Sequence, residues 1–352
     1  MALDLTPKTA ETLLEGEGGG YYNWTSSQMP LLAKNNLCAG RLVLHPQGFA
    51  LPHYADASKL GIVLQGNGGV AGLVTLNSGK EVVVKLEKGD IIPVPLASFS
   101  WWFNNGDTDI IIIFLGETTK ALIPGEISYF FPTGLQGLIR GISNELTSKA
   151  YNLTQEEVHK LTKSQTEPMM VKLTKDKSMP KPQIEHTKEL VFNVDGPNIH
   201  NVVKNGTLIT TLTEATFPFL GEVGLSVIRV TLEANAIKAP AYPSNVVAQL
   251  MYIARGSGKI EIVGLNGENI LNTEVEAGQL IVVPQFYVVA QIAGKAGLES
   301  YSIVRTTKPM IEELGGRASI WGVLSPVVIE TALNVDSEFL KLFLSKFKDT
   351  TN

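Results

Sequence analysis

Short runs of apolar and β-branched residues alternate with Gly, Pro and Asn along most of the chain. In the first half these runs recur about every ten residues, which is typical of the strands of a β-sandwich or β-barrel. The same rhythm returns in the second half, so two β units are predicted. The expected strands lie at residues 41–44, 61–64, 70–76, 81–86, 90–95, 109–115, 208–212, 225–232, 249–254, 259–263, 280–283 and 298–304.

Three sequence landmarks occur twice, in the same order and at a nearly constant offset. An internal duplication is the simplest explanation of this recurrence. The third landmark follows each β unit and predicts a helical tail, which in the first copy opens with a capping box formed by Thr154 and Glu157. The matching pairs are 63–68 (VLQGNG) with 253–258 (IARGSG), 88–95 (KGDIIPVP) with 277–284 (AGQLIVVP), and 150–156 (AYNLTQE) with 332–338 (ALNVDSE).

The predicted organisation has two domains and a connector. Residues 1–161 form an N-terminal barrel with its helical tail, and residues 189–352 form a C-terminal barrel with its own tail. Residues 162–188 are rich in Lys and Pro, which predicts a solvated linker. Within the second barrel, residues 256–258 (GSG) predict a turn between two strands. The helical tails are expected to be contact surfaces between copies or subunits.

Composition excludes several classes of function. The 352 residues are 44% apolar and 18% charged, which describes a folded chain with a substantial core. The net charge is −5 and no long basic run occurs, so we expect no nucleic-acid partner. No apolar run approaches the ~18 residues of a membrane helix, so no membrane partner is expected either.

Cysteine content and the start of the chain predict a cytoplasmic location. Cys38 is the single cysteine, which excludes an intramolecular disulfide and a Cys-based zinc site. The first twenty residues contain Asp4, Glu11 and Glu15 and no apolar core, so a secretory signal is not expected. A reducing, cytosolic compartment is the simplest interpretation.

The spacing of glycine and proline in both β units resembles that of the cupin barrel. Gly89 and Pro95, like Gly278 and Pro284, are separated by five residues, as in the second cupin motif. Residues 51–54 (LPHY), 278–285 (GQLIVVPQ) and 314–319 (LGGRAS) resemble segments of the plant 11S seed storage globulins. The resemblance covers about residues 18–348.

This resemblance implies a mainly β fold of two tandem cupin (jelly-roll) β-barrels, each followed by a small helical tail. It also implies a homo-oligomer, with a trimer expected and a dimer left open. The chain departs from storage globulins because it lacks their cysteine pair, their Gln/Glu-rich insert and their Asn-Gly cleavage site before a cysteine. It therefore resembles a cytosolic, unprocessed branch of 11S-globulin-like bicupins.

The resemblance also implies where a cupin would bind metal, namely through three His and one Glu. In the first barrel these positions hold His53, Ala55, Lys59 and Ser100. One imidazole beside an ammonium cannot hold a divalent ion, so we expect no metal and no cofactor. The corresponding residues of the second barrel are Ala241, Pro243, Gln249 and Val289.

The altered positions predict a ligand site in the first barrel instead. The candidate catalytic residues are His53 as acid or base, Lys59 as electrostatic stabiliser, and Ser100. Strand alternation places Ser100 and Trp102 on one face and Trp101 on the other, so Trp102 is expected to form a stacking wall. The candidate ligand-binding residues are Tyr54, Asp56, Trp101 and Trp102.

Each candidate residue also has a purely structural explanation. His53 alone is more often a hydrogen-bonded core residue than a catalyst. Lys59 is expected to reach solvent at the barrel mouth by bending its stem, in preference to burial. For Trp101 and Trp102 we favour filling of core space, with ligand stacking as the secondary option.

Three functions follow from these observations. The first is a cytosolic, non-storage bicupin that binds a small, largely apolar plant metabolite in the N-terminal barrel. His53 would also allow such a protein to act as a metal-independent isomerase, cyclase or lyase, so whether it is an enzyme stays open. The alternative is an 11S-globulin-like storage (nutrient reservoir) or structural protein without catalysis. A metal-dependent cupin oxygenase ranks third. A filled first-barrel lumen favours storage, whereas a cavity that touches His53 favours binding.

Overall fold

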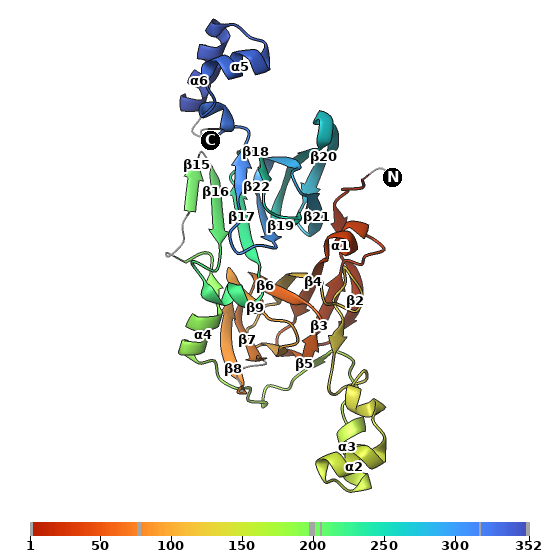
Figure 1. Cartoon of the computed structure of the whole chain (residues 1–352). Helices are drawn as coiled ribbons and strands as arrows, with labels where there is room; N and C mark the ends of the chain where they lie inside the picture. The colour runs from red at the N-terminus through yellow and green to blue at the C-terminus, as the bar shows by residue number, and fades with distance from the viewer. Residues whose placement is uncertain (1–2, 76–78, 197–200, 205, 317, 350–352) are drawn as a thin grey trace. The chain divides into compact units, whose positions relative to one another are not determined.

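The computed structural model describes residues 3–75, 79–196, 201–204, 206–316 and 318–349. The chain divides into two compact units (Figure 1). The N-terminal unit comprises Ala10–Pro197 with Phe219–Val223, and the C-terminal unit comprises Met1–Thr9, Asn198–Pro218 and Gly224–Asn352. Both units are mainly β with helical segments, which confirms the predicted fold class.

The N-terminal unit is a jelly-roll barrel of two antiparallel sheets. One sheet has the order β12-β5-β10-β7-β8, with β13 also paired to β5, and the other has the order β14-β9-β6-β11-β4-β3-β2. Its strands are β2 (Glu11–Gly16), β3 (Gly19–Asn23), β4 (Leu37–Leu44), β5 (Gly48–Ala55), β6 (Ser58–Gln65), β7 (Asn67–Val74), β8 (Val82–Glu87), β9 (Asp90–Val94), β10 (Phe99–Asn104), β11 (Ile110–Glu117), β12 (Tyr129–Phe130), β13 (Met170–Lys172) and β14 (Phe192–Asn193). Its helices are α1 (Pro30–Asn35), α2 (Asn144–Tyr151), α3 (Gln155–Lys163) and α4 (Ile184–Leu190).

The core of this unit lies between the inner faces of the two sheets. Leu42 on β4, Ile92 on β9, Ile112 on β11 and Trp102 on β10 belong to one buried cluster. The apolar pattern of the sequence predicts strands at the positions of β4, β9 and β11, but not at that of β10. Burying such side chains on both inner faces holds the sheets together by the hydrophobic effect.

The C-terminal unit forms one continuous antiparallel sheet. Its main path runs β1-β21-β19-β22-β17-β16-β15, while β20 pairs with β19, β18 pairs with β22, and β23 pairs with β18. Its strands are β1 (Lys8–Thr9), β15 (Asn201–Lys204), β16 (Thr207–Leu212), β17 (Ser226–Leu232), β18 (Ile237–Pro243), β19 (Ala248–Val263), β20 (Asn269–Glu276), β21 (Gln279–Pro284), β22 (Val288–Val304) and β23 (Ile311–Glu313). Its helices are α5 (Pro326–Leu333) and α6 (Ser337–Asp349).

The turn predicted at residues 256–258 is wrong. The two strands expected around it are a single 16-residue strand, β19. Its pairing with β22 shifts register between Ile253 and Arg255 and again between Gly256 and Gly258. The glycines therefore mark a bulge, which bends a strand without ending it.

The internal duplication is visible in the backbone. Gly89 and Gly278 occupy the same place in the two copies, and both have positive φ, at 87° and 96°. Asn152 and Asn334, which match in the third repeat, both end a helix in the left-handed conformation. Glycine and asparagine are the residues that adopt this conformation at least cost.

The helical tails form as predicted. α2 and α3 follow the first barrel, and α5 and α6 follow the second. At the start of α3 the Thr154 hydroxyl accepts the Glu157 N–H, while the Glu157 carboxylate accepts the Thr154 N–H, so the predicted capping box is confirmed.

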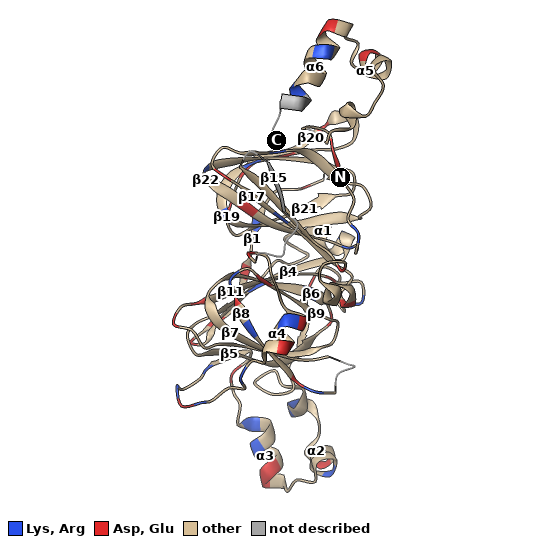
Figure 2. Ribbon diagram, turned by 90° about the vertical axis from the view of Figure 1, so that its left-hand side faces the viewer, with Lys and Arg blue, Asp and Glu red and all other residues tan. Residues whose placement is uncertain are grey.

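Residues 162–188 contribute ordered elements to the N-terminal unit. β13 pairs with β5, matching Met170 with Ala50, and α4 follows it. Positive and negative residues are interspersed over both units, and α4 carries both (Figure 2). None of the described helices is long and apolar enough to span a membrane.

Candidate functional site

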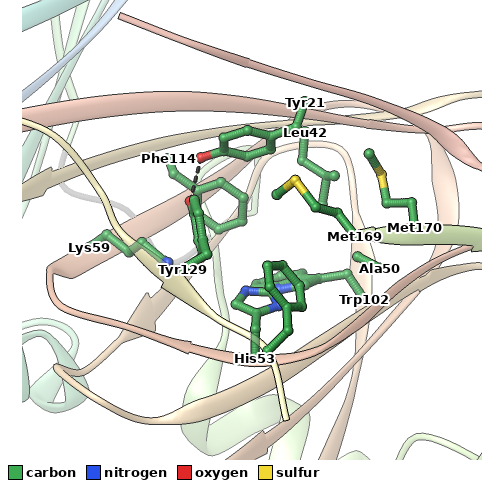
Figure 3. A pocket seen from close by; sticks show the side chains of 11 residues that line it. Tyr21, Leu42, Ala50, His53, Lys59, Trp102, Phe114, Tyr129, Met169 and Met170 are labelled. Carbon is green, nitrogen blue, oxygen red and sulfur yellow. Dashed lines mark hydrogen bonds between the residues drawn. The ribbon is translucent and has the colours of Figure 1, made fainter. Parts of the chain in front are cut away.

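A small cavity lies in the lumen of the N-terminal unit (Figure 3). Its volume is about 20 Å³, which admits about one water molecule. The walls come from the inner faces of β3, β4, β5, β6, β10 and β11, closed by residues next to or within β12 and β13. The lining residues are Tyr21, Leu42, Ala50, His53, Lys59, Trp102, Phe114, Tyr129, Phe131, Met169 and Met170.

His53 projects from β5 into this lumen and is buried. Its Nδ1 lies 2.8 Å from the Leu51 carbonyl oxygen, which can only accept, so Nδ1 carries the proton. Nε2 is then an acceptor and lies 3.5 Å from the Ser100 hydroxyl. Burial and the nearby Lys59 lower the pKa of His53 to about 3. The imidazole is therefore neutral at physiological pH.

Lys59 occupies the position on β6 where the cupin resemblance implies a glutamate. Its side chain is only 1% exposed, so the expectation that it reaches solvent is wrong. Tyr129, Phe131 and Met169 line the same cavity as Lys59. Burial lowers the pKa of Lys59 to about 8, and Cys38 and Asp56 offset this only in part.

The Lys59 amine faces aromatic rings. Its Nζ lies 4.5 Å from the centre of the Tyr129 ring and 5.3 Å from that of Phe114. Cation–π attraction of this kind is strongest where water is excluded. Among the interactions of the described residues, none is a hydrogen bond or ion pair to this amine. The cavity lining thus carries one cation and no carboxylate.

Two tyrosines form the wall beside Lys59. The hydroxyls of Tyr21 and Tyr129 share a hydrogen bond, drawn as a dashed line in Figure 3, and the rings meet edge to face. Burial raises the pKa of both phenols above its usual range, so both stay protonated. The Tyr129 ring also contacts His53 edge to face, with 5.1 Å between ring centres.

The remaining wall comes from chain that flanks the helical tail. β12 pairs with β5 before the tail, and β13 pairs with β5 after it. Leu51 donates its N–H to the Met169 carbonyl, which anchors the returning segment on β5. Phe131, Met169 and Met170 thereby close the cavity.

The structure brings together four of the seven predicted site residues. His53, Lys59 and Trp102 line the cavity, and Ser100 contacts His53. Trp102 meets the Phe114 ring edge to face, at 5.1 Å between ring centres.

The other three predicted residues do not line the cavity. Tyr54 stacks on Phe130. The Asp56 carboxylate accepts the N–H groups of Leu122 and Ser128 and so holds the following loop. Trp101 points to the opposite face of β10, as alternation predicts, and donates its ring N–H to Glu81.

Sequence reasoning missed Tyr21, Tyr129, Phe131, Met169 and Met170. Two signals were available. Residues 129–131 (YFF) are an aromatic run just before the first tail, and Met169 and Met170 begin an apolar run, 169–171 (MMV), inside the Lys- and Pro-rich connector.

The lumen residues do not fit a cupin metal. No group of three His, Cys, Asp or Glu among the described residues is placed to bind one. In the C-terminal unit, Ala241 and Val289 face each other as a buried pair on β18 and β22. Gln249 there donates to the Ser302 hydroxyl.

The family is shown by a profile described as Cupin, which matches residues 5–159 and 192–341. The chain belongs to the cupin family and contains two cupin domains. Its curated relatives include plant seed storage proteins, and the two cupin domains resemble those of the 11S globulins. Cocosin 1 of Cocos nucifera is 25% identical over 361 residues, covering 84% of this chain and 76% of that protein. The 12S seed storage protein CRB of Arabidopsis thaliana is 24% identical, covering 94% and 86%.

Solved structures support the same fold. Procruciferin, an 11S globulin from Brassica napus, superposes with a TM-score of 0.87 at 21% identity, covering 97% of this chain and 94% of that one. An 11S globulin from Wrightia tinctoria, described as revealing an auxin binding site, gives a TM-score of 0.86 at 20% identity, with 97% and 93% covered.

Replacing Lys59 by Met should stabilise the protein at neutral pH. The pKa of Lys59 is about 8 in the folded state against 10.5 in the unfolded state, so holding the proton costs the folded state roughly 3 kcal/mol below pH 8. Between these values the unfolded state binds more protons, so wild-type stability rises with pH and the penalty fades. Denaturant unfolding should therefore show an advantage for Lys59→Met that is largest at about pH 7 and shrinks toward pH 10. An advantage that does not change with pH would contradict this account.

Proposed function

We propose that the protein is a reservoir or structural protein of the 11S globulin kind, whose barrels carry out no catalysis. The proposal rests mainly on the packed lumen of the N-terminal unit. Where a cupin would hold its metal, the side chains leave about 20 Å³, enough for about one water molecule and too little for a metabolite. Relatives named as seed storage proteins support this proposal.

We also propose that the protein acts in the cytoplasm. Its single cysteine, Cys38, is buried, and burial raises the pKa of the thiol, so neither a disulfide nor thiol reactivity ties the chain to an oxidising compartment.

Quantifying the protein in cytosolic and vacuolar fractions of developing and germinating seeds tests both proposals. A reservoir should accumulate as seeds fill and fall severalfold during germination. A constant level through germination would contradict the reservoir role. Enrichment in the vacuolar fraction would contradict the cytoplasmic location.

For assembly we propose a homotrimer formed through the helical tails. The 11S globulin fold forms oligomers, and both tails of this chain present apolar side chains to solvent. Leu146 on α2 is 59% exposed and Val327 on α5 is 66% exposed. Apolar side chains gathered on short helices favour burial in a subunit contact.

Light scattering during size-exclusion chromatography should give three times the 38.1 kDa chain mass. The double variant Leu146→Glu, Val327→Glu should lower that mass to the monomer, because it places charges in the contact. Leu265→Glu is the matched control, since Leu265 is 77% exposed but lies outside the tails. A wild-type dimer, or a trimer that survives the double variant, would contradict the proposal.

A second function, binding of a small and largely apolar metabolite in the N-terminal unit, is favoured by Lys59. Its ammonium is buried beside aromatic rings, and the lining offers no counterion. An aromatic carboxylate would supply both an anion and a ring. The auxin site described for the Wrightia tinctoria globulin supports this class of ligand.

Entry of such a ligand requires side chains to move. Met169 and Met170 are unbranched and adapt easily to a new shape, so they are the part of the wall that can yield. In an isomerase, cyclase or lyase, His53 would take up a proton through Nε2. The lowered pKa makes His53 a weak base at pH 7, which supports binding over turnover.

Isothermal titration calorimetry with indole-3-acetate tests this second function. A saturable heat of binding is expected. Lys59→Met should weaken binding by about tenfold or more through loss of the charge. Tyr54→Phe should bind like wild type, because Tyr54 lies outside the cavity. No saturation at millimolar ligand, or equal affinity in Lys59→Met, would overturn the proposal.

A further inference from the structure

We propose that a groove on the N-terminal unit binds an extended, basic peptide segment of a partner protein. The groove has a volume of about 330 Å³. One wall is residues 14–19, where β2 ends and turns into β3, and the other is Glu167, Pro168 and β13. Its volume is much larger than the 20 Å³ of the lumen cavity and is typical of binding pockets, which begin at about 300 Å³.

β13 presents an open strand edge to this groove. The backbones of Met169 and Leu173 hydrogen-bond to β5 and to the residue before it. In an antiparallel pair the alternate residues, here Met170 and Lys172, point their N–H and C=O groups the other way, and both line the groove. No strand in the described part of the chain pairs with that side of β13. Such an edge accepts an added strand through main-chain hydrogen bonds.

The opposite wall is also the end of a sheet, and it is rich in glycine. β2 is the last strand of its sheet and pairs with β3. At Gly18 the turn packs closely on β13, because a Cβ there would lie 2.5 Å from the Val171 carbonyl oxygen. At Gly16 a Cβ would meet no described atom within 4 Å, so the space beside that residue is open. The groove therefore has room for a chain next to Gly16.

The charge of the groove favours a basic partner. Glu15, Glu17 and Glu167 line it, against Lys172 as the one basic lining residue. The Glu15 carboxylate is held by the Tyr22 hydroxyl, which donates to it at 2.7 Å. These carboxylates do not converge on a metal, since no group of three metal-binding side chains occurs among the described residues. Positive charges spaced along a chain would complement them better than a single ion.

Apolar side chains between the carboxylates suit the stems of lysine and arginine. Leu14, Pro168 and Val171 line the groove together with the glutamates. Long basic side chains lay their methylene stems on apolar surface and keep the charged head outside. Residues two apart in an extended chain share one face, so alternating basic residues would reach the glutamates together. A helical partner has no free main-chain groups in its interior to pair with β13, which is why an extended segment is favoured.

Fluorescence anisotropy of a labelled, end-blocked peptide, KVKVK, titrated with the full-length protein tests the proposal. Saturable binding is expected. The matched peptide EVEVE should bind at least tenfold more weakly, because its charges repel the glutamates of the groove. Equal affinity for the two peptides, or no saturation with KVKVK at submillimolar protein, would overturn the proposal. This comparison uses the wild-type protein alone, so it does not depend on the folding of any variant.

Two N-methylated forms of KVKVK test whether the peptide adds as a strand. One form carries methyl groups on the valine amides and the other on the lysine amides, so each loses the N–H donors of one strand edge. The form that is methylated on the edge facing β13 should bind at least tenfold more weakly than the other form. Equal affinity of the two forms would show that charge alone holds the peptide, and would overturn the added strand.

A variant that fills the groove tests its position. Gly16→Leu should weaken KVKVK binding at least tenfold, because the new side chain enters the open space beside β2. Gly141→Leu is the matched control, since a Cβ there also meets no described atom within 4 Å and Gly141 lies outside the groove. Equal affinities of the two variants would place the peptide elsewhere and contradict the proposal.

Charge reversal tests the role of the acidic wall. The double variant Glu17→Lys, Glu167→Lys should lower the affinity for KVKVK at least tenfold. Glu185→Lys, Glu189→Lys is the control, because it changes the net charge equally but lies on α4, outside the groove. An equal loss of affinity in both double variants would mean that only the overall charge of the protein matters, and would overturn the assignment of the groove.

Discussion

The N-terminal barrel encloses a positive charge that has no counterion among its lining residues. Lys59 stands on β6 with its amine against the Tyr129 and Phe114 rings, and the cost of removing it from water is the reason that its pKa falls. The same charge helps to keep His53 neutral. The burial of His53 itself lowers its pKa further, so the lumen combines a neutral imidazole with a buried amine.

Much of the fold could be predicted from the sequence because turns and helix ends are determined by residues close together in the chain. Turn glycines such as Gly89 and Gly278, the Thr154–Glu157 cap and the helix-ending Asn152 and Asn334 act within a few residues of themselves. Each of these features can therefore be recognised in the sequence without knowledge of distant contacts. The bulge in β19 was mistaken for a turn because a glycine pair marks both, and only pairing with β22 distinguishes them.

The site was less predictable because it is assembled from distant segments. His53, Lys59 and Trp102 were found through motif positions and strand alternation. Lys59 shares its cavity with Tyr129, Phe131 and Met169, which lie in or next to β12 and β13, and both of these strands pair with β5. Nothing in the sequence near Lys59 carries that information. A cupin whose metal positions are altered can thus become a solid core or a closed ligand pocket with the same fold.

The central claim is that the Lys59 amine is buried and that burial lowers its pKa below that of a surface lysine. The most direct measurement is a pH titration of the lysine side chains by ¹³C–¹⁵N NMR, with the Lys59 signal assigned by its absence in Lys59→Met. The account predicts that one signal, that of Lys59, titrates near pH 8 while the surface lysines titrate near 10.5. A Lys59 signal that titrates together with the surface lysines would show that the amine reaches water or an anion, and would contradict the account.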